Sequence, residues 1–119
     1  QSGLGTPSAL DPRGVILFFE DIGERPHRMD RMLSQFAQAG WFSAAKAVVL
    51  GDFVLSEAKD RRDLWNDVIP RFARSIRIPV YSGVPSGHNP KKQWPLPLNV
   101  PTHLTRLGKL VVANPMWRS

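Results

Sequence analysis

The hydrophobic and polar positions alternate between strand-like blocks and helix-like blocks. Residues 14–20 (GVILFFE) form an apolar run of strand length with polar flanks, which predicts a buried β-strand. After Arg25-Pro26, apolar residues recur at helical spacing: Met29, Met32, Leu33 and Phe36. Gly40 follows this pattern at the position where a left-handed residue would end a helix.

The same alternation continues along the chain. Residues 46–53 (KAVVLGDF) predict a second strand, and a polar loop over 56–60 leads to a second helical pattern. That pattern contains Leu64, Trp65, Val68, Phe72 and Ile76. Pro70 lies inside it and predicts a kink or a late start to the regular hydrogen bonding. Residues 78–84 (IPVYSGV) predict a third strand, and the proline-rich segment 94–113 predicts a closing hairpin.

This order predicts an α/β fold with a mainly parallel sheet, right-handed crossovers with flanking helices, and a short antiparallel addition near the C-terminus. The length of 119 residues suits one domain with one core. The small polar residues of 1–13 predict a linker, which would follow a preceding domain, and 14–119 would form the folded domain. The longest apolar run, five residues from Val15, is too short to cross a membrane.

The composition excludes several kinds of chemistry. The absence of cysteine excludes disulfides, thiolate zinc sites and cysteine nucleophiles. The three histidines lack the close spacing of metal ligands, and no glycine-rich phosphate loop is present, so we expect no metal and no cofactor. The 16 Lys and Arg against 10 Asp and Glu give a net charge of +6. These basic residues are scattered, which favours a solvated surface over a nucleic-acid interface.

Polar residues follow the predicted strands where ligands gather in open α/β sheets. Glu20 ends the first strand and Asp52 the second, whereas His88 and Asn89 follow the third. His88 would act as a general base or bond a neighbouring carbonyl group, and Glu20 would orient a base. The other acidic residues of this block, Asp21 and Glu24, are better placed to cap the next helix. Asp52 and Asn89 would contact a ligand or form turns.

A recognisable nucleophile is missing, because the chain contains no Gly-x-Ser-x-Gly turn. Ser86, close to His88, is more typical of a loop hydrogen-bonding residue than of an attacking group. The chain therefore offers an acid and a base for catalysis without the group that would attack a substrate.

Four blocks closely resemble the C-terminal domain of the LD-carboxypeptidases, a family of serine peptidases. They are LFFEDIGERPHRMDRML at 17–33, VVLGDF at 48–53, IPVYSGVPSGH at 78–88 and LPL at 96–98. The resemblance implies a swivelling β/β/α type of domain. It also implies a Ser-His-Glu triad in which Glu20 and His88 come from this domain and the serine comes from an N-terminal domain.

The resemblance further implies release of the terminal D-alanine from murein tetrapeptide during peptidoglycan recycling, in the cytoplasm, by a homodimeric enzyme. The chain alone would then be inactive, because it lacks the serine. Two alternatives remain open at this point. One is an immunity peptidase of the same family that cleaves antibiotics resembling aminoacyl-adenylates, and the other is a non-catalytic binding module for acidic polymers.

Overall fold

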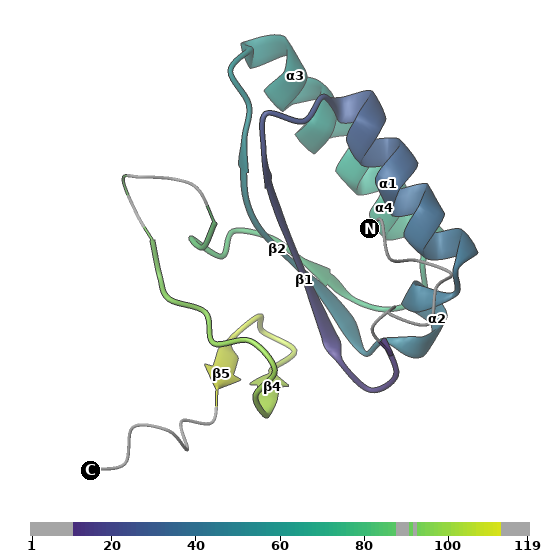
Figure 1. Cartoon of the computed structure of the whole chain (residues 1–119), viewed down its shortest axis with the longest axis vertical. Coiled ribbons are helices and arrows are strands. Elements are labelled where there is room, and N and C mark those ends of the chain that lie inside the picture. The colour runs from purple at the N-terminus through teal and green to yellow at the C-terminus, as the bar shows by residue number, and fades with distance from the viewer. Residues whose placement is uncertain (1–10, 88–90, 92, 113–119) are drawn as a thin grey trace.

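The computed structural model describes residues 11–87, 91 and 93–112. Strands and helices alternate in the first two thirds of the chain, and a short hairpin follows (Figure 1). The elements are β1 (Ile16–Ile22), α1 (Pro26–Gln38), α2 (Trp41–Ala44), β2 (Ala47–Val54), α3 (Ala58–Asp63), the π-helical turn η1 (Leu64–Val68), α4 (Ile69–Ser75), β3 (Val80–Tyr81), β4 (Thr102–Leu104) and β5 (Leu110–Val112). The predicted α/β class is confirmed.

The first three strands form a parallel sheet in the order β1-β2-β3. Its two crossovers place α1, α3 and α4 on the same face (Figure 1). The register between β1 and β2 shifts between Phe19 and Asp21, so that one extra residue of β2 stands opposite Glu20. β4 and β5 pair antiparallel as a separate two-stranded sheet, which confirms the predicted hairpin.

The core lies between the sheet and its helices. Side chains alternate along a strand, and Leu17 of β1 and Leu50 of β2 belong to the same buried cluster as Leu33 of α1 and Leu64 of η1. Leu50 and Leu64 have no exposed surface. Burying a side chain of this size contributes about 1.5–3 kcal/mol, so this layer holds β1 and β2 rigidly under the helices.

Pro70 perturbs its helix as predicted. Proline has no N–H with which to bond the carbonyl four residues earlier. Immediately before it, the N–H of Ile69 donates to the carbonyl of Leu64, five residues earlier, which is the π-helical pattern of η1. The second helical region is therefore continuous in space but locally widened.

Several boundaries differ from the sequence prediction, and β1 and β2 continue past Glu20 and Phe53, to Ile22 and Val54. α3 begins at Ala58, inside the segment predicted as a polar loop. The hydrophobic pattern did not predict this helix, because none of its side chains is buried and it lacks an apolar stripe. β3 contains only Val80 and Tyr81, although the apolar pattern extended to residue 84. Gly83 has a left-handed φ of 89°, which turns the backbone away from the sheet after these two residues.

The predicted cap of α1 was wrong. Arg25 occupies the N-cap position and makes no side-chain cap hydrogen bond, and the first turn contains no acidic residue. Glu24 instead forms an ion pair with Arg28, at 3.6 Å. Pro26 at the start of the helix reduces the need for a cap, because it has no N–H and its φ already suits a helix.

Candidate active site

The segment after β3 crosses the carboxyl end of β2 in close contact. The N–H of Asp52 donates to the carbonyl of Ser86 at 2.8 Å. A Cβ atom on Gly51 would overlap that same carbonyl and would lie 2.5 Å from the Phe18 ring. Only glycine at position 51 therefore lets the Ser86 turn lie directly on the sheet.

Gly87 lies between two acidic residues near the carboxyl ends of β1 and β2, Glu20 and Asp52, each two positions before the last residue of its strand. A Cβ atom on Gly87 would stand 3.1 Å from Oε2 of Glu20 and 3.1 Å from Cβ of Asp52. The φ of Gly87 is 138°, a backbone conformation that side-chain-bearing residues rarely adopt. The structure thus brings Glu20 and Asp52 to one turn, although they are 32 positions apart in the chain.

His88 and Asn89 lie outside the described residues, so their predicted roles stay predictions. The chain nevertheless reaches His88 directly from Gly87, and consecutive α-carbons are separated by about 3.8 Å. The backbone that leads into the histidine therefore starts in van der Waals contact with the Glu20 side chain.

Two hydrogen bonds close the base of the loop that contains His88. The N–H of Trp94 donates to the carbonyl of Pro85, and Nε2 of Gln93 donates to the carbonyl of Gly87, each at 2.7 Å. Sequence reasoning did not find Gln93, because it belongs to no motif and lies in a proline-rich stretch. The two bonds hold together the residues that enter and leave the loop.

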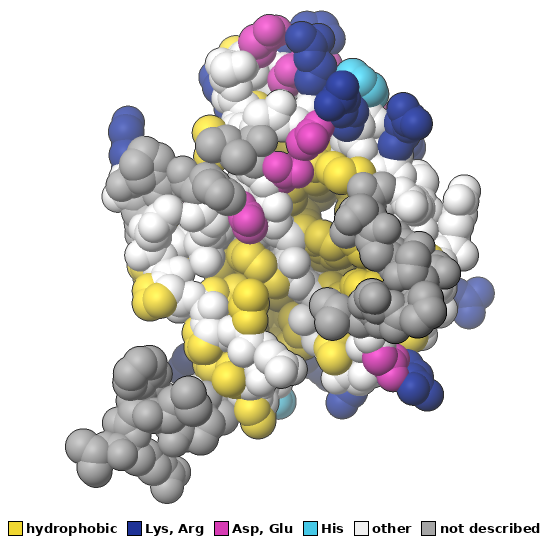
Figure 2. Space-filling view, in the orientation of Figure 1, with side chains coloured by type: hydrophobic (Ala, Val, Ile, Leu, Met, Phe, Trp, Pro, Cys, Tyr) yellow, Lys and Arg dark blue, Asp and Glu magenta, His cyan; other side chains and the backbone are white. Residues whose placement is uncertain are grey.

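A small apolar cavity of about 210 Å³ adjoins Glu20. Met29, Met32 and Leu33 of α1 form one wall, and Phe19 of β1 forms another. Glu20 also lines this cavity. On the face seen in Figure 2, acidic side chains stand at the edge of a hollow lined by hydrophobic side chains. An apolar cavity thus lies beside the strand that contains Glu20.

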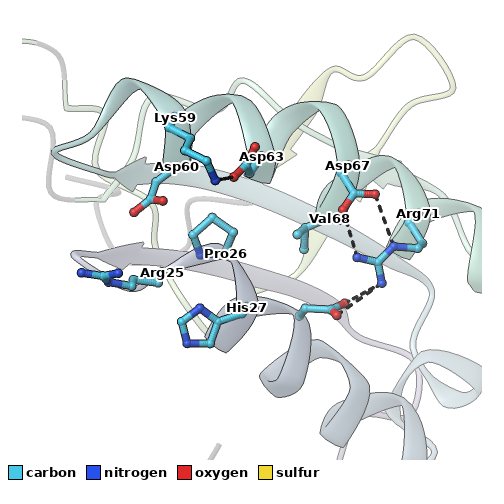
Figure 3. A pocket seen from close by; sticks show the side chains of 10 residues that line it. Arg25, Pro26, His27, Lys59, Asp60, Asp63, Asp67, Val68 and Arg71 are labelled. Atoms are coloured by element: carbon cyan, nitrogen blue, oxygen red, sulfur yellow. Dashed lines mark hydrogen bonds and ion pairs between the residues drawn. The ribbon is translucent and has the colours of Figure 1, made fainter.

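A larger cleft of about 380 Å³ lies between the start of α1 and the helices α3 to α4 (Figure 3). Most of its charged groups pair with one another: Arg71 bonds Asp30 and Asp67, at 3.1 and 3.2 Å. Lys59 bonds Asp63 at 2.7 Å, and this hydrogen bond raises the pKa of Lys59. Glu20, Asp52 and Gly87 do not line the cleft. It is a weaker candidate, since it contains none of the predicted site residues and most of its charged side chains pair with one another.

The described residues contain no group of three or more histidine, aspartate or glutamate side chains that could hold a metal ion. Glu20 and Asp52 lie instead on the two sides of Gly87, and the Asp52 N–H donates to the Ser86 carbonyl.

The structure defines an α/β domain with acidic residues near the carboxyl ends of its parallel strands, and comparison with known proteins gives the family. Residues 1–104 match the family model described as the LD-carboxypeptidase C-terminal domain. The chain belongs to the LD-carboxypeptidase family, of which it contains this C-terminal domain.

Named relatives agree with this assignment. The murein tetrapeptide carboxypeptidase of Pseudomonas aeruginosa is 32% identical over 85 residues, which are 71% of this chain and 28% of the relative. A Bacillus subtilis protein named "Probable murein peptide carboxypeptidase" is 34% identical over 89 residues, 73% of this chain and 28% of that protein. The crystal structure of muramoyltetrapeptide carboxypeptidase from Oxalobacter formigenes matches 92% of this chain and 39% of its own, with 37% identity and a TM-score of 0.77.

The chain therefore spans well under half the length of each of these proteins. Within the described part of the chain, no helix has the length and apolar character needed to cross a membrane.

Replacing Gly51 by alanine tests the close crossing of the Ser86 turn. The added methyl group would meet the Ser86 carbonyl and the Phe18 ring, and we expect it to destabilise the protein by about 1–3 kcal/mol or more. Gly23→Ala is the control: no atom lies within 4 Å of its added methyl group, so only the strain of its left-handed φ of 78°, about 1 kcal/mol, applies. Urea unfolding of both variants measures the difference. Equal stability of Gly51→Ala and the unmodified protein would contradict the crossing.

Proposed function

We propose that this chain is the histidine- and glutamate-bearing part of a serine-type LD-carboxypeptidase, which releases the terminal D-alanine of murein tetrapeptide in peptidoglycan recycling. One observation carries the proposal: the carboxylate of Glu20 lies against Gly87, the residue directly before His88. The names of the P. aeruginosa and O. formigenes relatives support the substrate class.

The chemistry follows from the roles of a triad. His88 takes the proton of a serine hydroxyl as that oxygen attacks the carbonyl carbon before D-alanine. The proton then passes from His88 to the amine of the departing D-alanine, and a second cycle with water hydrolyses the acyl-enzyme. Glu20 accepts the other ring N–H of His88, which selects the tautomer and stabilises the imidazolium. The serine and the oxyanion hole belong to an N-terminal domain.

The remaining expectations concern the whole enzyme. We propose a cytoplasmic homodimer that needs no metal or cofactor for this reaction. The net charge of +6 suits a peptide substrate with several carboxylates. Cleavage of aminoacyl-adenylate analogues and binding of acidic polymers are the two alternative outcomes of the test below.

D-alanine release from murein tetrapeptide tests the function. The complete enzyme, with the N-terminal domain joined to this chain, is expected to release D-alanine, whereas this chain alone releases none, because it lacks the serine. A tetrapeptide ending in L-alanine serves as the control substrate and should remain intact. Cleavage of an aminoacyl-adenylate analogue without release of D-alanine would overturn the murein assignment, and inactivity on both substrates would favour a binding module.

A further inference from the structure

Residues 93–101 (QWPLPLNVP) form an uncharged and mostly apolar segment without helix or strand. Seven of the nine residues are apolar, prolines included, and the side chains of Trp94 and Leu98 are 60% and 71% exposed. In Figure 1 the segment runs beside the sheet, on the side away from the helices. A continuous apolar stretch at the surface marks an interaction site more often than a surface that faces only water.

The start of this segment is bonded to the turn beside Glu20. Nε2 of Gln93 donates to the carbonyl of Gly87, and the N–H of Trp94 donates to the carbonyl of Pro85, each at 2.7 Å. Oε2 of Glu20 lies 3.1 Å from the place of a Cβ on Gly87. The apolar segment therefore begins at the edge of the candidate active site.

The rest of the segment is held in an extended form. Prolines at positions 95, 97 and 101 restrict its φ angles. Its far end continues into β4, and the turn between β4 and β5 lies against β3, because a Cβ atom on Gly108 would stand 3.4 Å from Cδ1 of Tyr81. A segment that is already ordered loses little conformational entropy when a partner covers it, which favours binding.

We propose that segment 93–101 is the surface on which the serine-bearing N-terminal domain of the complete enzyme packs. This inference rests on the proposed function, in which the serine comes from that domain. An enzyme as long as the P. aeruginosa and O. formigenes relatives has most of its chain outside these 119 residues, and that chain is available to cover the segment. The serine has to reach the edge at which Glu20 lies, and the segment begins at that edge.

A second copy of this chain is the other occupant that would cover apolar side chains. The site does not need a second copy, whereas it is incomplete without the serine. A domain joined to the same chain is also present at a high effective concentration, which a separate copy is not. The N-terminal domain is therefore the better fit, and the second copy is an outcome of the test.

Leu98→Cys in the complete enzyme tests the inference, because residues 1–119 contain no cysteine. Ser34→Cys is the matched control, since Ser34 is also exposed but lies on α1, on the helix side of the sheet. The rate at which a soluble disulfide reagent modifies each new thiol reports its exposure, after subtraction of the rate for the unmodified enzyme. We expect Leu98→Cys to react at least about 10-fold more slowly than Ser34→Cys, because the N-terminal domain covers it.

Equal rates for the two thiols would overturn the proposed packing. A photoreactive benzoylphenylalanine at position 98 then identifies what covers the segment. A crosslink within one chain, to residues that precede this domain, is expected, and a crosslink between two copies would overturn the inference. Release of D-alanine by the unmodified enzyme is measured in parallel: release with equal thiol rates overturns the packing alone, whereas a protected thiol without release overturns the proposed function alone.

Discussion

Replacement of His88 by alanine in the complete enzyme is expected to lower kcat on murein tetrapeptide by about 10⁴- to 10⁶-fold. Without the imidazole, no group accepts the serine proton during attack or returns it to the departing amine. The KM should change far less, because the substrate still meets the same binding surface. Steady-state release of D-alanine measures both constants, and retention of the wild-type kcat would remove His88 from the mechanism.

His103→Ala is the control for this experiment. His103 is exposed on β4, in the hairpin rather than in the parallel sheet, and its partner across the hairpin is Val111. Its removal should leave both kcat and KM unchanged. A large loss of activity in His103→Ala as well would mean that the enzyme is sensitive to substitution in general. The result for His88→Ala would then carry no information on catalysis.

The convergence of Glu20 and Asp52 was predictable from the sequence, because parallel neighbouring strands end at the same edge of a sheet. An apolar run marks each strand, and the first acidic residue after it, Glu20 or Asp52, lies near the carboxyl end, although each strand continues for two more residues. The helix α1 was equally predictable, because its apolar stripe and the glycine after it are local signals. Gly40 does adopt the expected left-handed conformation, with a φ of 81°.

The close fit around the Ser86 turn could not be predicted in this way. The need for glycine at positions 51 and 87 arises from atoms that belong to β1, β2 and the crossing segment together. No local pattern contains that information, since each glycine alone also suits an ordinary turn. The hydrogen bond from Gln93 to Gly87 is similar, because it depends on where the two ends of a loop meet.

Helix α3 was missed by the sequence prediction for a different reason. Its six residues bury no side chain, and most of them are charged, so the spacing of hydrophobic residues does not predict a helix there. Its stabilisation comes from side-chain pairs such as Lys59 with Asp63, four positions apart, and from its continuation into η1. Periodicity detects helices that contribute to a core, and α3 does not.

Glu20→Gln is expected to lower kcat by about 10⁴-fold, because glutamine leaves the size of the side chain intact and removes the charge that fixes the tautomer of His88. Glutamine has nearly the shape of glutamate and fits the same space beside Gly87, so the fold and the thermal stability should stay close to those of the unmodified enzyme. Circular dichroism and D-alanine release, measured on the same preparation, separate folding from catalysis.

The neighbouring carboxylate provides a control at the same strand end. Asp21→Asn removes one charge a single position away, and we expect kcat to change less than about threefold, because triad function depends on contact with the base rather than on local charge alone. The double variant with Glu20→Gln and His88→Ala should be no slower than His88→Ala alone, since residues of a triad act as a unit. Additive losses in the double variant would mean that Glu20 acts independently of His88, in which case the contact between Glu20 and Gly87 would have a structural purpose only.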